Sequence, residues 1–224
     1  ATFSKGGAEL ISGDADGHLK RWDAKQGQLI AARRVESGID SIRVSPDDKL
    51  IAVGTRNGDI VLWDTRLTRQ LARFSGSRAR VMSVAFVSNQ ELASGSADGV
   101  IRVWNIETKR ERIRLSDARG RILALDVSSD RRWLAGAGED EVIRIWDLEQ
   151  GKLLASLRDH EGPIRDVRFA PGRAWLASAS DDASIRLWDL KVLDTPPERL
   201  LRDAKQRYGA ESMNMATFDW DLYE

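Results

Sequence analysis

Apolar and polar residues alternate in short runs over most of the chain. In the run Ser184–Asp189, Ile185 and Leu187 fall on one face of an extended strand, and a Trp and an Arg fall on the other. The runs Pro163–Phe169 and Ala174–Ser180 precede it and end in the turn-forming letters APG and DDA. This pattern predicts short antiparallel strands joined by tight turns.

The same pattern recurs at a constant interval, which is marked by tryptophans followed by Asp or Asn. These are Trp22, Trp63, Trp104, Trp146 and Trp188, with intervals of 41, 41, 42 and 42 residues. A fourth strand fits between repeats, as in Lys152–Arg158. Four strands in each period of about 42 residues predict a radial array of four-stranded blades.

Period, strand pattern and Trp-Asp dipeptides together resemble the WD-repeat (WD40) family of β-propellers, from residue 1 to about residue 191. The resemblance implies an all-β propeller of four-stranded antiparallel blades. We expect five blades at about 1–37, 38–78, 79–119, 120–161 and 162–191, followed by a C-terminal helix and acidic-aromatic tail at 192–224. The run Ala1–Ser4 resembles the end of an innermost strand whose start is absent.

The family resemblance also implies a polar network in each blade, made of a His, a strand Ser or Thr, a turn Asp and the Trp. Only the fifth blade has all four, as His160, Ser178, Asp182 and Trp188. Blade one keeps Ser12, Asp16 and Trp22, and blade two keeps Asn57 and Trp63, with Val53 and Val35 at the other two positions. Blade three keeps Ser94, Asp98 and Trp104, with Ser77 in place of the His. Blade four keeps Asp140 and Trp146, with Gly136 and Ala118 at the other two positions. We interpret these residues as structural, because the chain has no Gly-x-Ser-x-Gly elbow to present a nucleophile.

Composition narrows the chemistry further. The chain has no Cys and two His, so we expect no zinc site, and it has no phosphate-cradling Gly-rich motif, so we expect no cofactor. The run Gly138–Glu141 is interpreted as a solvated turn. Lys+Arg and Asp+Glu both number 35, and neither a signal peptide nor an apolar span is visible. We therefore expect a cytoplasmic protein without a membrane or nucleic-acid partner.

Arginines gather in the loops that family topology brings to one face of the propeller. They are Arg33, Arg34, Arg56, Arg78, Arg80, Arg119 and Arg121, with Arg165 just inside blade five. Blade five instead places Asp159, Glu161 and Asp181 on this face. The basic arc predicts an acidic peptide or protein partner, because Arg captures carboxylates in a bidentate way. The alternative is a set of ordinary solvated loop charges.

The C-terminal region differs from the repeats. Asp194–Gly209 predicts a helix with Thr195 as its cap, and Met215–Glu224 is either an added strand or a docking segment. Seven blades would need more residues than the chain has, so we expect a larger ring with further blades or domains upstream; the alternative is a complete five-bladed ring closed by the tail. A propeller with such a helix is weakly similar to the C-terminal repeats of bacterial multidomain signalling ATPases (NACHT or STAND type).

The leading functional hypothesis is a non-catalytic scaffold that binds a protein or peptide on its loop face. One alternative is the ligand-sensing or recruiting arm of a larger signalling ATPase. A second is a propeller enzyme, for which Asp40, Asp126, Arg165 and Asp166 on or near innermost strands are the candidates. A third is an architectural subunit whose faces are all buried in an assembly.

Overall fold

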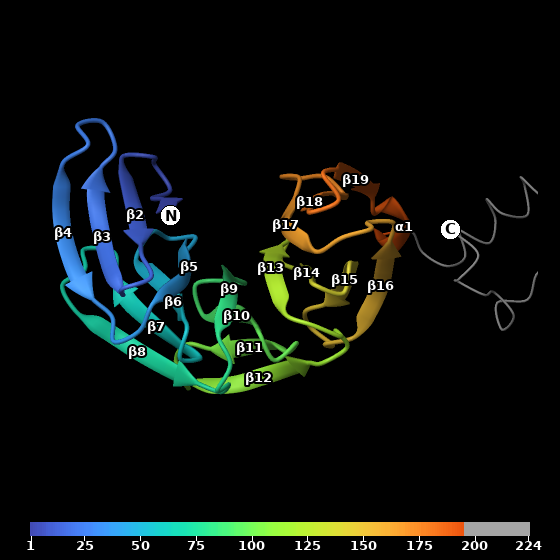
Figure 1. The fold of residues 1–224 in the computed structure, drawn as a ribbon, viewed down its shortest axis with the longest axis horizontal. Helices are drawn as coiled ribbons and strands as arrows, with labels where there is room; N and C mark the ends of the chain where they lie inside the picture. The colour runs from blue at the N-terminus through green and yellow to red at the C-terminus, as the bar shows by residue number, and fades with distance from the viewer. Residues whose placement is uncertain (195–224) are drawn as a thin grey trace, which may run out of the picture.

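The computed structural model describes residues 1–194, which form five antiparallel sheets arranged side by side along an open arc (Figure 1). We number the sheets as blades one to five in chain order. Blade one and blade five lie at the two ends of the arc and do not meet (Figure 1). The all-β propeller-blade architecture predicted from the tryptophan period is confirmed. The tail that was expected to close a five-bladed ring lies outside the described residues.

Each of the first four blades has four strands, and three strands of blade five are described. Blade one consists of β1 (Thr2–Phe3), β2 (Glu9–Gly13), β3 (His18–Asp23) and β4 (Leu29–Arg34). Blade two consists of β5 (Ile39–Val44), β6 (Leu50–Thr55), β7 (Asp59–Asp64) and β8 (Gln70–Ser75). Blade three consists of β9 (Val81–Phe86), β10 (Glu91–Ser96), β11 (Ile101–Asn105) and β12 (Arg110–Leu115). Blade four consists of β13 (Ile122–Val127), β14 (Trp133–Gly138), β15 (Val142–Asp147) and β16 (Leu153–Arg158). Blade five consists of β17 (Ile164–Phe169), β18 (Trp175–Ser180) and β19 (Ile185–Asp189).

A single helical turn, α1 (Lys191–Asp194), follows β19. The predicted helix at Asp194–Gly209 and the tail segment Met215–Glu224 lie outside the described residues, apart from Asp194 itself. Within residues 1–194, no helix is long and apolar enough to span a membrane.

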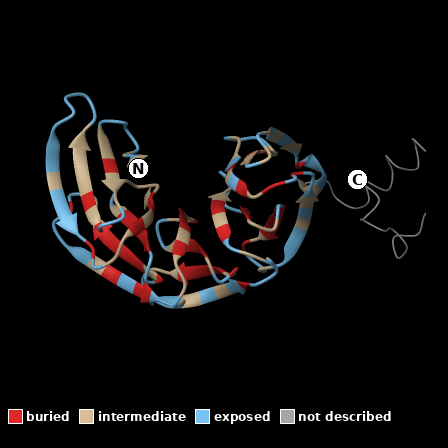
Figure 2. Ribbon diagram, in the orientation of Figure 1, coloured by how far each residue is buried: buried red, intermediate tan, exposed pale blue. Residues whose placement is uncertain are grey.

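The core lies between the blades, where the apolar face of one sheet packs on the next. Ile11 and Leu19 of blade one pack against Ile51, Val53 and Trp63 of blade two. Figure 2 shows buried residues concentrated on the inner strands, while the outer strands β4, β12 and β16 are largely exposed. Burying one such side chain contributes about 1.5–3 kcal/mol, so each blade depends on its neighbour for stability.

Side-chain oxygens on the innermost strands tie adjacent blades together. The Ser41 hydroxyl accepts a 3.1 Å hydrogen bond from the Val84 amide, and Ser83 accepts one of 3.1 Å from Leu125. The Asp126 carboxylate accepts a 2.7 Å bond from the Phe169 amide. These bonds satisfy backbone donors that the sheet ladder leaves unpaired, and they fix the offset between consecutive blades.

Two kinds of connection meet on one side of the arc, and we call this side the loop face. It comprises residues 14–17, 35–38, 56–58, 76–80, 97–100, 116–121, 139–141, 159–163 and 181–184. Backbone bonds hold the connections together, such as Ala97 N to Arg80 O at 2.8 Å. Gly58 shows how closely they approach: its φ is +92°, and a Cβ there would lie 2.2 Å from the carbonyl oxygen of Ser77.

Candidate functional site

The predicted network of blade five comes together as one continuous chain of hydrogen bonds. The Trp188 indole N–H donates to Ser178 Oγ at 2.9 Å, and Ser178 Oγ lies 2.7 Å from His160 Nε2. His160 Nδ1 lies 2.6 Å from Asp182 Oδ2. Bonds from the Ser184 hydroxyl first, and then from His160, hold the pKa of Asp182 well below its ordinary value. The carboxylate is therefore ionised and accepts a hydrogen bond from His160 Nδ1.

This Ser-His-Asp order resembles a hydrolytic triad, but its environment makes it a structural lock. Ser178 is 2% exposed, and the His160 side chain is fully buried. The serine oxygen also accepts a hydrogen bond from the indole N–H, so Trp188 and His160 both hold the hydroxyl in place. A nucleophile must reach a substrate carbon, and Ser178 has no surface from which to do so.

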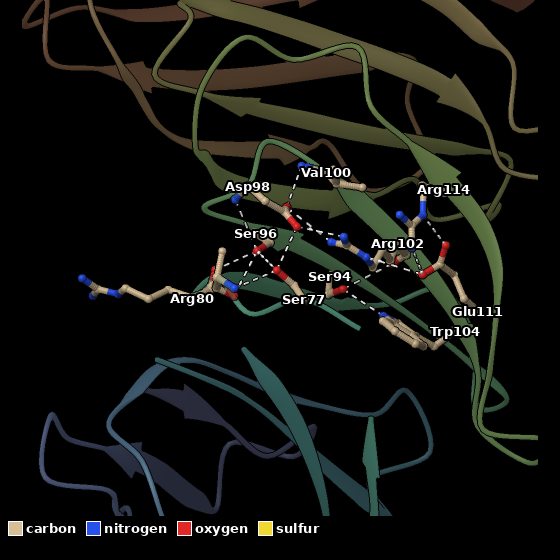
Figure 3. Close-up of polar contacts among 11 residues, drawn as sticks. Ser77, Arg80, Ser94, Ser96, Asp98, Val100, Arg102, Trp104, Glu111 and Arg114 are labelled. Carbon is tan, nitrogen blue, oxygen red and sulfur yellow. Dashed lines mark hydrogen bonds and ion pairs between the residues drawn. The ribbon is translucent and has the colours of Figure 1, made fainter. Parts of the chain in front are cut away.

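Blade three builds its network differently, as Figure 3 shows. Trp104 donates to Ser94 Oγ at 2.9 Å, while Ser77, at the position of the missing His, donates to Asp98 at 2.8 Å. Arg102, only 5% exposed, forms a 2.8 Å ion pair with Asp98. Burial alone would raise the pKa of Asp98, but the bonds from Arg102 and Ser77 outweigh it and lower that pKa. An arginine therefore supplies the partner that the His supplies in blade five.

In blade four too, an arginine pairs with the turn aspartate where blade five has a His. Arg144 pairs with Asp140 at 2.7 Å, and both side chains are less than a tenth exposed. The Trp146 indole, which faces Gly136 in place of a Ser, donates instead to Asp117 Oδ2 at 3.3 Å. Sequence reasoning missed Arg102, Arg144 and Asp117. The Asp-x-x-x-Arg spacing of the two pairs was the available signal for the arginines, whereas nothing local to Trp146 points to Asp117.

Blade one has a shorter network than predicted. Trp22 donates to Ser12 Oγ at 2.8 Å, but Asp16, expected in this network, does not join it among the described residues. The Asp14 carboxylate stabilises the turn instead, because it accepts a 2.9 Å hydrogen bond from the backbone N–H of His18. The reason is local: the His18 amide and ring both face Asp14, and this backbone bond is the first cause of the lowered pKa of Asp14.

Blade two has no acceptor for its tryptophan. The Trp63 indole nitrogen is buried and has no hydrogen-bond partner among the described residues, as expected with Val53 at the position of the Ser. Val35, at the position of the His, is 5% exposed and packs in the core shared with blade one. Asn57 accepts a 2.6 Å bond from the Thr55 hydroxyl, so it stabilises the turn rather than the indole.

Half of the predicted basic arc is already neutralised by carboxylates. Arg80 binds Asp40 through two 3.0 Å bonds, and Arg56 adds a third bond of 3.2 Å to the same carboxylate. The other pairs are Arg121 with Glu139, at 2.7 Å, and Arg165 with Asp181, at 2.8 Å. Acids that are distant in sequence therefore fold against these four arginines, and their charges are paired within the chain.

The remaining arginines differ in position and in bonding. Arg33 and Arg34 were expected in a loop, but they are the last two residues of β4 and pair with Leu19 and His18. Arg33 donates to the carbonyl oxygen of Ala32. Among the eight arginines of the predicted arc, Arg34, Arg78 and Arg119 have exposed side chains that form no hydrogen bond or ion pair with another described residue.

The candidates for a catalytic centre are all engaged in the framework. Asp40 pairs with Arg80, and Arg165 with Asp181, as above. Asp166 forms a 2.8 Å ion pair with Arg168. Burial raises the pKa of Asp126, although its carboxylate accepts the Phe169 amide across the blade junction. The Asp14, Asp16 and His18 side chains lie close enough together to approach a cation, but they form a partly exposed cluster in which His18 already contacts Asp14.

The comparisons with known proteins agree with this architecture. A family model described as "Nucleolar protein 10-like, N-terminal domain" matches residues 1–198. The Arabidopsis thaliana protein "Cell division cycle 20.1, cofactor of APC complex" is 32% identical over 85 residues, covering 36% of this chain and 19% of that protein. The Candida glabrata protein "CCR4-associated factor 4 homolog" is 25% identical over 103 residues, covering 38% of this chain and 18% of that protein.

The aligned region thus spans less than a fifth of the length of either relative. The family match supports the WD40-like β-propeller resemblance. The weaker resemblance to bacterial signalling ATPases receives no support from these matches.

Proposed function

Since the chain belongs to the nucleolar protein 10-like N-terminal domain family of β-propellers, we propose that it is a non-catalytic scaffold whose loop face binds an acidic protein or peptide segment. The observation that carries this proposal is the set of uncompensated arginines on that side of blades one to three. Arg34, Arg78 and Arg119 lie next to or within the connections that lead into three successive innermost strands.

These three arginines recur at nearly the blade period, at intervals of 44 and 41 residues. Arg34 ends the strand β4, and Arg78 and Arg119 stand on loops between packed strands, so the blades set the backbone positions of all three. A guanidinium presents parallel N–H donors that match a carboxylate in geometry and charge. An extended chain with several acidic side chains could therefore contact one arginine per blade.

Two further observations support a protein over a nucleic acid. The loop face as defined by the described residues carries no Phe, Trp or Tyr, so it has no platform on which bases could stack. The names of the two relatives also describe a cofactor and an associated factor of protein assemblies. Binding within an assembly is the role that we extend to this chain.

The family name also bears on location. It describes a nucleolar protein, so we propose the nucleolus rather than the cytoplasm that the sequence led us to expect. The signalling role remains without support. Imaging a fluorescent fusion together with a nucleolar marker would test the location, and a diffuse cytoplasmic signal would contradict it.

The binding proposal can be tested with a defined probe. A fluorescein-labelled peptide of eight glutamates should bind the wild-type chain and lose at least tenfold in affinity to the double variant Arg78→Glu/Arg119→Glu. The matched control is Arg66→Glu/Arg110→Glu, which changes the net charge equally at exposed residues outside the loop face. Equal losses in both variants, or tighter binding of a poly-uridylate RNA than of the peptide, would contradict the proposal.

A further inference from the structure

The second residue of the innermost strand is left out of the sheet ladder in blades two to five. In blade three the pairing of β9 with β10 leaves out Met82, and in blade four the pairing of β13 with β14 leaves out Leu123. Blades two and five leave out Asp40 and Arg165 in the same way. A β-bulge of this kind re-aims the side chain of its extra residue. We call these four the bulge residues.

The bulge residues stand near the loop face, on the strands that line the inner side of the arc (Figure 1). The Ser83 hydroxyl, one residue after Met82, accepts a bond from the amide of Leu125, two residues after Leu123. The Ser41 bond at the preceding junction joins the same two positions. Adjacent innermost strands therefore keep a constant offset, so the bulge residues of neighbouring blades lie at the same level.

The row of bulge residues is charged at its ends and apolar in its middle. Asp40 and Arg165 are both held in ion pairs. Between them Met82 and Leu123 are half-buried, although the residue before each of them is only 2% exposed. Blades three and four thus present two adjacent apolar side chains, partly accessible, between two ion pairs.

The free arginines of the same two blades have a fixed relation to this apolar pair. Arg78 stands four residues before Met82, and Arg119 stands four residues before Leu123. Both arginines are exposed, and neither side chain bonds another described residue. Each blade therefore repeats one arrangement, with a guanidinium in the loop and an apolar side chain at the start of the strand. This arrangement is complementary to a segment in which acidic residues flank an apolar one.

We propose that Met82 and Leu123 receive an apolar side chain from the acidic segment whose carboxylates bind Arg78 and Arg119. The inference rests on the proposed function and specifies its partner as an acidic segment interrupted by a residue such as leucine. Methionine suits such a contact, because its flexible side chain adapts to the shape of what packs on it. An apolar side chain removed from water adds affinity that solvent-exposed charge pairs supply only weakly.

Two peptides of equal charge test the apolar contact. Both are eight residues long with glutamate at seven positions, and the fourth position is leucine in one and serine in the other. The leucine peptide should bind the wild-type chain about tenfold more tightly than the serine peptide. In Met82→Ser/Leu123→Ser this preference should disappear, while the affinity for the serine peptide stays unchanged and shows that the arginines are still in place.

The matched control is Leu153→Ser/Leu154→Ser on the outer strand β16, which should keep the full preference. Equal binding of the two peptides by the wild type, or a preference that survives in Met82→Ser/Leu123→Ser, would overturn the inference. The proposed function would still stand if the eight-glutamate peptide bound through Arg78 and Arg119. If no peptide bound the wild type, both proposals would fail.

Methyl NMR gives a second readout on the unmodified side chains, because the chain has three methionines, Met82, Met213 and Met215. With methyl-labelled methionine, the signal that is absent from Met82→Leu belongs to Met82. The leucine peptide at saturation should shift this signal more than the serine peptide does, because its apolar side chain contacts the thioether. Equal shifts with both peptides, or no shift with either, would also overturn the inference.

Discussion

Arg144 and Asp140 form a buried 2.7 Å ion pair in blade four, where blade five instead holds its turn aspartate, Asp182, against His160. Blade three has the same arginine solution, with Arg102 and Asp98. The turn carboxylate is thus present in all three blades, and what changes is its cationic or donor partner. Blades three and four therefore keep a bonded turn carboxylate without the His.

We expect Arg144→Met to destabilise the chain by about 3 kcal/mol, because it leaves the Asp140 carboxylate buried without its cation. Urea unfolding followed by tryptophan fluorescence would measure the change. The double variant Arg144→Met/Asp140→Asn should recover part of the loss, since the uncompensated charge is gone. Arg158→Met, on the exposed outer strand β16, is the control and should change the free energy of unfolding little. A loss in Arg144→Met no larger than in this control would contradict the interpretation.

The tryptophans of blades two and three should respond differently to the same substitution. Trp104→Phe removes a donor from Ser94, which is 3% exposed, and leaves that hydroxyl without its indole partner. Trp63→Phe removes an indole N–H that has no partner among the described residues. We expect Trp104→Phe to cost about 1–3 kcal/mol more than Trp63→Phe. Thermal and urea unfolding of both variants would measure this difference, and equal losses would rule it out.

The regular part of the fold could be predicted from the sequence because it depends on local information. The tryptophan period and the alternation around Ile185 and Leu187 indicate strands, turns and blades without knowledge of any partner. The four residues of the blade five network also come together as the family pattern implies. Bounds differ by about one residue, as in Pro163–Phe169 against β17, because a proline cannot begin the ladder as a donor.

The contacts that could not be predicted join residues from different repeats. Arg80 and Asp40 are 40 residues apart, and Trp146 and Asp117 are 29 apart, so both pairs depend on how loops of adjacent strands and blades approach. The sequence identifies Arg80 as a loop arginine, but whether its charge is free depends on the Asp40 carboxylate, which the preceding blade places beside it. For this reason, fewer arginines of the basic arc are free of a carboxylate partner than the sequence suggests.

The Arg80–Asp40 pair leads to a prediction about the proposed binding. Asp40→Asn should tighten binding of the eight-glutamate peptide by about threefold at low salt, because it releases the charges of Arg80 and Arg56 on the loop face. Titration at two ionic strengths would measure the effect, which should shrink as salt rises. Asp47→Asn neutralises an equal charge outside the loop face and should leave affinity unchanged. An unchanged affinity in Asp40→Asn would show that these two arginines do not face the peptide.

The final prediction concerns pH and the blade five network. Hydrogen bonds from Ser184 and His160 lower the pKa of Asp182 from its ordinary value of 3.8 in the folded chain. A carboxylate with a depressed folded pKa stabilises the fold fully above its unfolded pKa, and this contribution is lost as pH falls through the lower, folded value. Asp182→Asn lacks the carboxylate and therefore lacks this dependence. The difference in unfolding free energy between the wild type and Asp182→Asn should be constant from pH 7 to about 5, and should narrow as the pH falls below about 4.

Urea unfolding of the wild type and Asp182→Asn at several pH values would measure this difference, in which the titration of all other carboxylates cancels to first order. Asp16→Asn is the matched control, because Asp16 lies in the equivalent turn of blade one but stays outside its network; its difference from the wild type should remain small throughout. A difference for Asp182→Asn that stayed the same from pH 7 down to pH 2.5 would mean that the carboxylate charge does not stabilise this network. The His160–Asp182 contact would then act through shape and neutral hydrogen bonding alone.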